Sequence, residues 1–152
     1  MISRDPMDDR DRIKRGKKLE RATGKQAKRL VFRNVFIDGQ DAKMARILWN
    51  YFEAVEERWP EAWESEDLGN ILPRTNGFAA LMRFFVPVYT SFDRPDEIID
   101  KAEFGSIFEQ SELADDCFTR DNYVPGTSGQ TKLYRNLMKA LPQPSDLFSD
   151  LD

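Results

Sequence analysis

The spacing of apolar residues between Lys43 and Trp59 is the sequence feature that most limits the fold. The apolar side chains in this segment are Met44, Ile47, Leu48, Tyr51, Phe52, Val55 and Trp59. They recur every three or four residues, which places them on one face of an α-helix. Arg46 and Glu53 stand on the opposite face, and Pro60 ends or redirects the helix. The segment is therefore predicted to be an amphipathic helix whose apolar face joins a core.

Further segments of the body also have helical patterns. One follows possible caps at 75–76 and runs up to Pro87, and another begins at Pro95. A last helix follows the Gly-rich loop at 125–130 and ends at Pro142. Before the first helix, residues 30–37 can form a short strand, because they are rich in β-branched and aromatic side chains.

These patterns define the expected fold class. The chain has 152 residues, of which 40% are hydrophobic and 12% aromatic, so it can bury one core. We expect a mainly α fold: a compact bundle of four to five helices with a flexible basic N-terminal arm, and the short strand as an optional element. The expected division is a partly disordered basic arm at 1–35, a helical domain at 36–141 and an acidic, mobile tail at 142–152.

Charge is distributed unevenly along the chain. Residues 1–35 contain twelve Lys or Arg and five Asp or Glu, a net charge of +7. Residues 36–152 contain eleven Lys or Arg and 22 Asp or Glu, a net charge of −11. A basic arm of this kind is typical of segments that follow a phosphate backbone, where release of counterions supplies affinity without sequence preference. The alternative is a disordered tail, or one that lies on the acidic surface of the same protein.

Two candidate binding sites follow from this pattern. The candidate nucleic-acid-binding residues are Arg10, Arg12, Lys14, Arg15, Lys17, Lys18, Arg21, Lys25, Lys28 and Arg29. The candidate anion-binding loop consists of Gly126, Ser128, Gly129 and Lys132, because free N–H groups at the start of a helix attract a phosphate. The alternative for this loop is a tight turn in which glycines permit a positive φ and Ser128 caps the helix.

Several function classes are excluded by what the sequence lacks. The chain has no histidine and one cysteine, Cys117. Ser-His-Asp and Cys-His catalysis, histidine-ligated metals and an internal disulfide are therefore excluded. No apolar run is long enough for a membrane span, and the N-terminus has no apolar signal region. We expect a cytoplasmic protein that is not an enzyme, with no catalytic residue, no metal and no cofactor.

Three stretches of sequence, in this order, carry a family resemblance. They are LWNYFEAV at 48–55 followed by WPEAW at 59–63, ILPRTNGFAALMR at 71–83, and PGTSGQTKLY at 125–134. Together they resemble the C-terminal helical region of DGQHR-domain proteins. That family is similar to ParB/sulfiredoxin-like proteins and includes DndB-like members connected with DNA phosphorothioation and phage defence. The resemblance implies an accessory protein in DNA modification, defence or mobile elements.

The family's name-giving motif belongs to an N-terminal α/β core for which this chain has no room. The resemblance therefore implies a helical module that stands alone, with a protein partner that carries the missing α/β core. The first functional hypothesis is a non-enzymatic module whose basic arm contacts the phosphates of DNA or RNA. The second is an acidic interaction subunit or inhibitor, phage- or mobile-element-encoded, that docks on a basic nucleic-acid-handling protein. The oligomeric state stays open at this level.

Overall fold

The computed structural model describes residues 1–142 as a chain of short and long helices. The α-helices are α1 (Pro6–Lys14), α2 (Gly24–Arg29), α3 (Arg33–Ile37), α4 (Asp41–Arg58), α5 (Pro60–Glu64), α6 (Thr75–Ser91), α7 (Lys101–Phe108) and α8 (Thr127–Met138). One 3₁₀ turn, η1, spans Asp115–Cys117. Residues 1–142 contain no β-strand, and a single isolated bridge joins Asn70 to Thr119. The mainly α bundle is confirmed.

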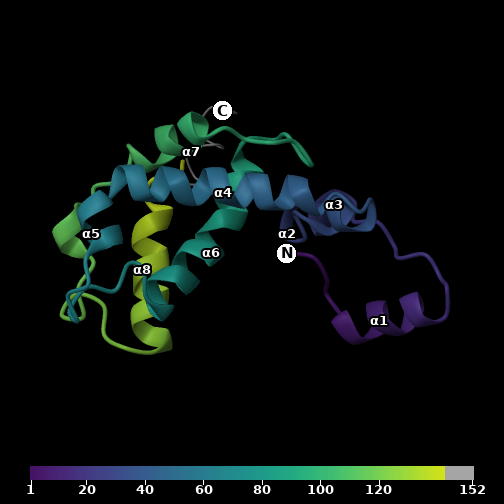
Figure 1. The fold of residues 1–152 in the computed structure, drawn as a ribbon, viewed down its shortest axis with the longest axis horizontal. Helices are drawn as coiled ribbons and strands as arrows, with labels where there is room; N and C mark the ends of the chain where they lie inside the picture. Colours follow the sequence, from purple (N-terminus) through teal and green to yellow (C-terminus); the bar gives the residue numbers. More distant parts are fainter. Residues whose placement is uncertain (143–152) are drawn as a thin grey trace, which may run out of the picture.

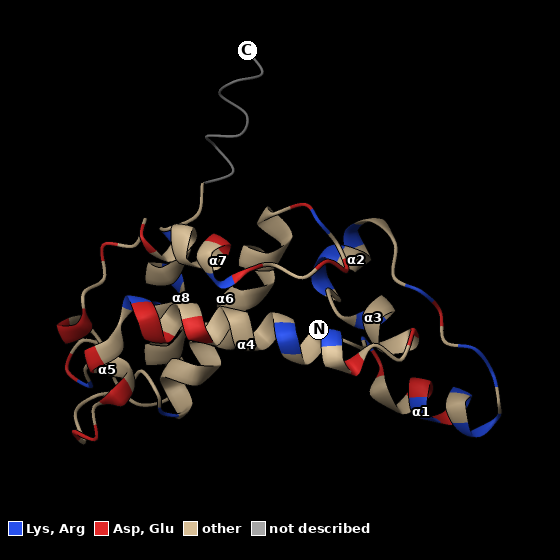
Figure 2. Cartoon of the chain, turned by 45° about the horizontal axis from the view of Figure 1, so that its top comes forward, with Lys and Arg blue, Asp and Glu red and all other residues tan. Residues whose placement is uncertain are grey.

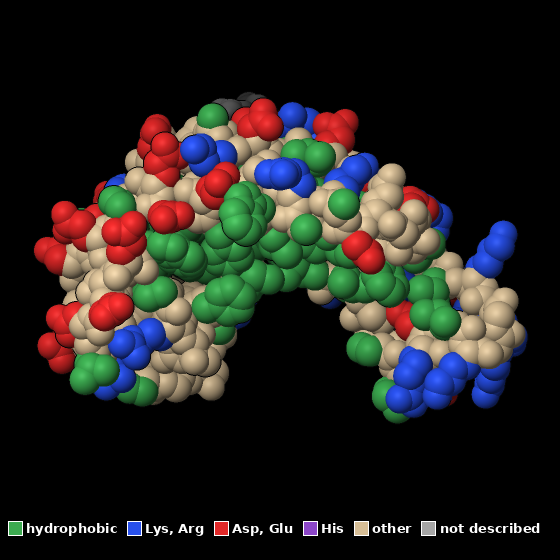
Figure 3. Space-filling view, viewed as in Figure 1, with side chains coloured by type: hydrophobic (Ala, Val, Ile, Leu, Met, Phe, Trp, Pro, Cys, Tyr) green, Lys and Arg blue, Asp and Glu red, His purple; other side chains and the backbone are tan. Residues whose placement is uncertain are grey.

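The helices are arranged as an arch (Figure 1). α4 forms the span of the arch, with α5, α6 and α8 toward one end and α1, α2 and α3 toward the other. α4 packs most extensively on α7, and α6 packs on α8. The hollow side of the arch is visible as a concave surface in the space-filling view, and hydrophobic side chains gather along it (Figure 3).

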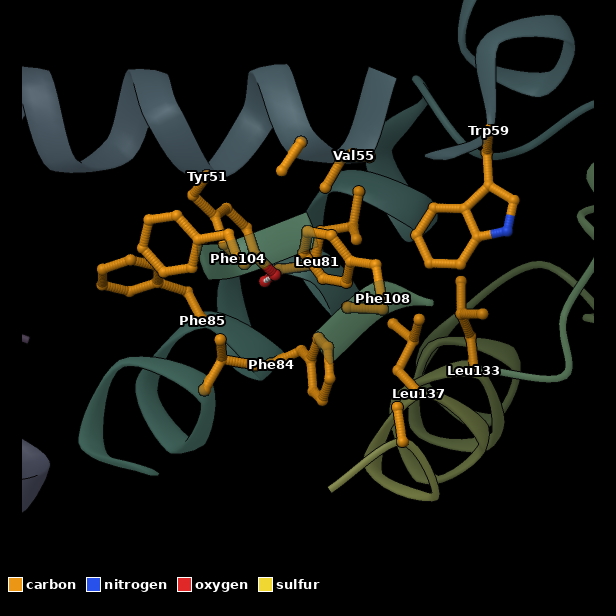
Figure 4. Close-up of a cluster of buried hydrophobic side chains, with 14 of the residues drawn as sticks. Tyr51, Val55, Trp59, Leu81, Phe84, Phe85, Phe104, Phe108, Leu133 and Leu137 are labelled. Atoms are coloured by element: carbon orange, nitrogen blue, oxygen red, sulfur yellow. Dashed lines mark hydrogen bonds between the residues drawn. The ribbon is translucent and has the colours of Figure 1, made fainter. Parts of the chain in front are cut away.

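Aromatic side chains fill much of the core, and Tyr51 points from α4 into it (Figure 4). Its ring is fully buried and meets Phe85, Phe104 and Phe108 edge-on, with centroids 5.1–5.4 Å apart. Its hydroxyl donates a hydrogen bond of 2.6 Å to the Leu81 carbonyl. Edge-to-face ring pairs stabilise a core beyond the contribution of the apolar area that they bury. The apolar face of α4 is therefore held by α6 and α7 together.

The predicted strand at 30–37 is wrong. Residues 31–32 form a turn, and α3 occupies the rest of the segment. Val31, Phe32 and Val35 are buried. Their spacing of one and three residues matches a helical turn rather than the alternation of a strand. The core therefore includes residues that the sequence analysis assigned to the arm.

Two predicted boundaries in the middle of the chain also differ. α6 continues through Pro87 to Ser91, because Val88 and Tyr89 beyond the proline are buried and hold the last turn. An interior proline costs a helix about 3 kcal/mol, and this burial offsets it. The helix expected from Pro95 begins later, at Lys101, where the Glu103 carboxylate accepts a 3.0 Å hydrogen bond from the Asp100 N–H. The predicted tail lies outside the described residues from position 143 on.

Candidate nucleic-acid interface

Arg33 is the side chain that makes the most polar contacts between the N-terminal segment and the body, beside a backbone bond from the Phe32 N–H to the Met1 carbonyl and two bonds between Asn34 and Ala22. The Arg33 side chain is buried and forms two hydrogen bonds with the Asp9 carboxylate, at 2.7 and 3.0 Å. It also donates to the carbonyls of Ile2 (3.1 Å) and Glu20 (2.6 Å). A guanidinium offers five donors in a fixed plane, which suits one carboxylate and two carbonyls at once. Arg33 thus connects α3 with three separate places in the segment that precedes α2.

The electrostatics of this contact favour the ionised pair. The hydrogen bonds from Arg33 and then from Ser3 lower the pKa of Asp9 from 3.8 to about 2. The same contact with Asp9 raises the pKa of Arg33 above its ordinary value. Both groups therefore stay charged at neutral pH, and the segment is held against the core rather than detached from it.

Three of the ten predicted nucleic-acid-binding residues are neutralised by nearby acids. Arg12 lies 3.0 Å from Asp8, Arg21 lies 2.6 Å from Asp38, and Arg10 lies 3.9 Å from Asp11. Exposed pairs of this kind contribute little to stability, but they lower the charge offered to a phosphate. These three arginines are the weaker part of the predicted set.

The other seven predicted cations are exposed and form no ion pair within residues 1–142. They fall into two groups on the N-terminal part of the arch (Figure 2). The loop cluster contains Lys14, Arg15, Lys17 and Lys18, at the end of α1 and in the following loop. The α2 cluster contains Lys25, Lys28 and Arg29.

The predicted anion-binding loop has a different architecture from the one expected. Gly126 adopts a φ of +99°, which glycine permits, and α8 begins at Thr127 with no side-chain cap. The expectation that Ser128 caps the helix is therefore wrong. Gly129 already lies inside α8, where a Cβ would stand 1.8 Å from the Val124 carbonyl oxygen. The glycine at 129 serves close packing of the helix on the preceding loop.

Lys132, the cation of that loop, is engaged by the fold. Its ammonium group donates a 2.7 Å hydrogen bond to the Asn122 carbonyl and lies 5.4 Å from the centre of the Tyr123 ring. Its side chain thus braces the loop before α8. The arm and this loop lie at opposite ends of the arch, so the structure does not combine them into one site (Figure 1).

Sequence analysis missed a basic face on α8. Lys132, Arg135 and Lys139 are exposed and line an open groove of about 530 Å³ with Thr131 and Asn136. Their spacing of three and four residues would have placed them on one helical face. A neighbouring groove of about 490 Å³ lies where α6 and α8 begin, and Arg74 and Arg120 are part of its lining.

The acidic residues of the body also gather at one place. Glu61, Asp67, Asp115, Asp116 and Asp121 line an open groove of about 500 Å³ near α5 and η1. Within residues 1–142, no group of three or more His, Cys, Asp or Glu is placed to hold a metal ion. This groove therefore offers a negative surface rather than a metal centre.

Comparison of the chain with protein-family models, curated proteins and solved structures gave no match. Within residues 1–142, no helix has the length and apolar character needed to cross a bilayer. Functional conclusions consequently depend on the residues and geometry described above.

Proposed function

We propose that this protein is a non-enzymatic nucleic-acid-binding module that contacts backbone phosphates through the loop cluster and the α2 cluster. The observation that supports this proposal is the set of seven exposed cations that form no ion pair within residues 1–142. A lysine or arginine without an acidic partner does not have to break an ion pair before it binds a phosphate. Phosphate contacts of this kind give affinity without reading sequence.

The attachment of the segment through Arg33 supports the same function. Because Asp9 and Glu20 are tied to Arg33, the loop between α1 and α2 is closed at both ends. A loop held in this way loses less conformational freedom on binding than a free tail does. We therefore propose that the loop cluster presents its charges in a restricted arrangement.

The biological setting that we propose is DNA modification or phage defence, on the basis of the resemblance to DGQHR-domain proteins. The three stretches that carry the resemblance coincide with major elements of the body: 48–55 lies within α4, 71–83 leads into α6 and 125–134 leads into α8. A companion protein with an α/β core is the proposed protein partner.

A salt-titrated binding assay tests the proposed function. Labelled duplex and single-stranded DNA are titrated with the intact chain, with K14Q/R15Q/K17Q/K18Q, and with K25Q/K28Q/R29Q. Removing the four charges of the loop cluster is expected to reduce the slope of log K against log salt by about 3 to 4 for duplex DNA. The control, R135Q/K139Q, removes two exposed charges from the basic face of α8 and should leave affinity nearly unchanged.

Two outcomes would contradict the proposal. One is that the intact chain shows no binding at low salt. The other is that the α8 control lowers affinity as much as the loop-cluster variant does, because binding would then reflect charge in general or the face of α8. Circular dichroism of each variant shows that the helices are retained.

One observation favours a second candidate function, an acidic subunit that docks on a basic nucleic-acid-handling protein. The acidic groove near α5 also contains Leu68, which is 71% exposed. An exposed apolar side chain within a charged rim is a common anchor in protein interfaces. This function predicts a stable complex with the basic partner that E61Q/D67N/D116N/D121N weakens, with no binding of DNA by the isolated chain.

A further inference from the structure

The face of α4 beside its core-facing residues, named here its outer face, carries a second stripe that is apolar except for Glu56 and is exposed except for the half-buried Phe52. Ala42, Ala45, Trp49, Phe52 and Glu56 recur at alternating steps of three and four residues along this helix. This is the heptad spacing by which one helix packs along another. The core-facing residues of α4, including Ile47, Tyr51 and Val55, lie on a different face.

Trp49 is the central residue of this stripe and is 63% exposed. It borders a shallow depression with Ala42, Ala45 and Arg46. Phe52 extends the apolar surface toward α6, because its ring stacks on that of Phe78 with centroids 5.5 Å apart, and Phe78 is 50% exposed. Exposed apolar patches of connected residues are typical of interaction surfaces.

The charges beside the stripe are complementary between two copies of the chain. Arg46 stands three residues before Trp49, whereas Glu53 and Glu56 stand four and seven residues after it. Arg46 and Glu53 form no ion pair with any residue of 1–142. An antiparallel pairing of two α4 helices centred near Trp49 places Arg46 of one copy beside Glu53 of the other, and does so twice. In a parallel, in-register pairing, Arg46 of one copy and Glu53 of the other would stand two helical turns apart along the axis and could not pair.

We propose that the outer face of α4 binds a second copy of this chain, with the two α4 helices antiparallel about a two-fold axis near Trp49. Trp49 and Phe52 from both copies form the apolar centre. Ala42 and Ala45 have small side chains that let the helices approach closely on either side of it. The reciprocal pairs between Arg46 and Glu53 set the direction of the helices. A two-fold interface uses the same surface of both copies, so that surface has to be self-complementary.

Charge exchange tests this proposal directly. Sedimentation equilibrium of the full chain, over about 1 µM to about 1 mM, measures the dimer dissociation constant. Arg46→Glu alone and Glu53→Arg alone are each expected to weaken the dimer by about tenfold or more, because each brings like charges together. The double variant R46E/E53R is expected to restore dimerisation close to that of the unaltered chain, since each ion pair forms again with its ends exchanged.

Trp49→Ala tests the apolar centre. It is expected to give a monomer that keeps its helical circular dichroism, because an exposed side chain contributes little to the core. Met7→Ala is the matched control, since Met7 is 60% exposed but stands outside α4, in α1, and it should leave the dimer intact.

Three results would overturn the proposal. The first is a chain that stays monomeric over the whole concentration range. The second is a dimer that Trp49→Ala leaves unchanged, which would place the interface elsewhere. The third is a double charge variant that dimerises no better than the single ones, which would show that Arg46 and Glu53 do not meet.

Discussion

Arg33 and Asp9 stand 24 residues apart in sequence and form a bidentate ion pair in which both side chains are largely buried. Asp9 belongs to α1, and no apolar side chain of this helix is buried. The contacts of one guanidinium therefore hold α1 to the body, together with the contacts that Met1 and Ile2 make just before the helix. The basic loop that follows α1 depends on the same contacts at its start, and at its end also on the bonds of Arg21 with Asp38 and of Ala22 with Asn34.

The first prediction concerns removal of this guanidinium. Arg33→Ala leaves the Asp9 carboxylate and two carbonyls without their donor, and it should lower the free energy of unfolding by about 3 kcal/mol. Hydrogen exchange should rise in α1 and in residues 15–21, whereas α4 and α6 should stay protected. Urea unfolding and exchange mass spectrometry provide the two measurements.

Arg21→Ala is the control for the first prediction. Arg21 pairs with Asp38, but both side chains are about half exposed, and exposed pairs are worth about 0–1 kcal/mol. If the two variants lose equal stability, or if exchange in α1 does not change in Arg33→Ala, the tethering role of Arg33 is refuted.

The second prediction is a pH dependence of the same contact. The pKa of Asp9 is lowered from 3.8 to about 2, so the folded state favours the ionised carboxylate more than the unfolded state does. Its stabilisation is complete above about pH 4–5 and is lost as the pH falls toward 2, and it amounts to about 2 kcal/mol. The stability difference between the unaltered chain and Asp9→Asn should therefore shrink over this interval. Chemical denaturation between pH 2 and 6 measures it, and a constant difference would contradict the lowered pKa.

The third prediction concerns glycine at position 129. A Cβ there would meet the Val124 carbonyl oxygen at 1.8 Å, and this oxygen belongs to the backbone and cannot rotate away. Gly129→Ala should therefore destabilise the fold by about 1–3 kcal/mol through overpacking. Gly105→Ala is the matched control, because it also lies in a helix but has nothing within 4 Å of the new Cβ. It should stabilise the protein by about 0.5–1 kcal/mol. Thermal unfolding that ranks the two variants in the opposite order would be inconsistent with the packing described for α8.

The fourth prediction concerns alkaline pH. Burial, followed by the negative charge of Asp96, raises the pKa of Tyr89 to about 12, and burial raises the pKa of Tyr51 well above its ordinary value. A tyrosine in the unfolded chain ionises near pH 10. The folded state should consequently lose stability as the pH rises from about 10 to 12. Tyrosinate absorbance and helical circular dichroism followed together should report ionisation and unfolding as one transition.

Tyr89→Phe separates the contribution of one ring. It removes the hydrogen bond of 2.7 Å from the hydroxyl to the Glu97 carbonyl, which should cost about 1 kcal/mol at neutral pH. Because this variant has no proton to lose at position 89, its stability should fall less steeply above pH 10. A fall as steep as that of the unaltered chain would show that Tyr89 does not contribute to alkaline unfolding.

Much of the fold was predictable where local periodicity and burial agree. The pattern from Met44 to Trp59 predicted α4, whose observed bounds are Asp41–Arg58. Pro87 illustrates the opposite situation, because local chemistry predicts a helix end there, whereas burial of Val88 and Tyr89 extends the helix. The energy of tertiary packing is absent from any local pattern, and it exceeded the cost of one proline.

The candidate site was predictable only in its composition. The density of Lys and Arg before residue 30 identified the basic segment, but it could not separate Arg12 and Arg21, which pair with acids, from Lys17 and Lys18, which do not. Arg33, which holds the N-terminal segment against the body, was not among the predicted binding residues. An arginine that is buried and one that is solvated look alike in sequence.

The sequence by itself determined the helical class, the amphipathic face of α4 and the charge separation between the N-terminal segment and the body, because these depend on residue type and spacing along the chain. The tertiary structure alone decided which cations are free, where the N-terminal segment lies and which face of α4 is left without a partner. Those properties depend on contacts between residues such as Asp9 and Arg33, which are distant in sequence and meet only when the core has formed.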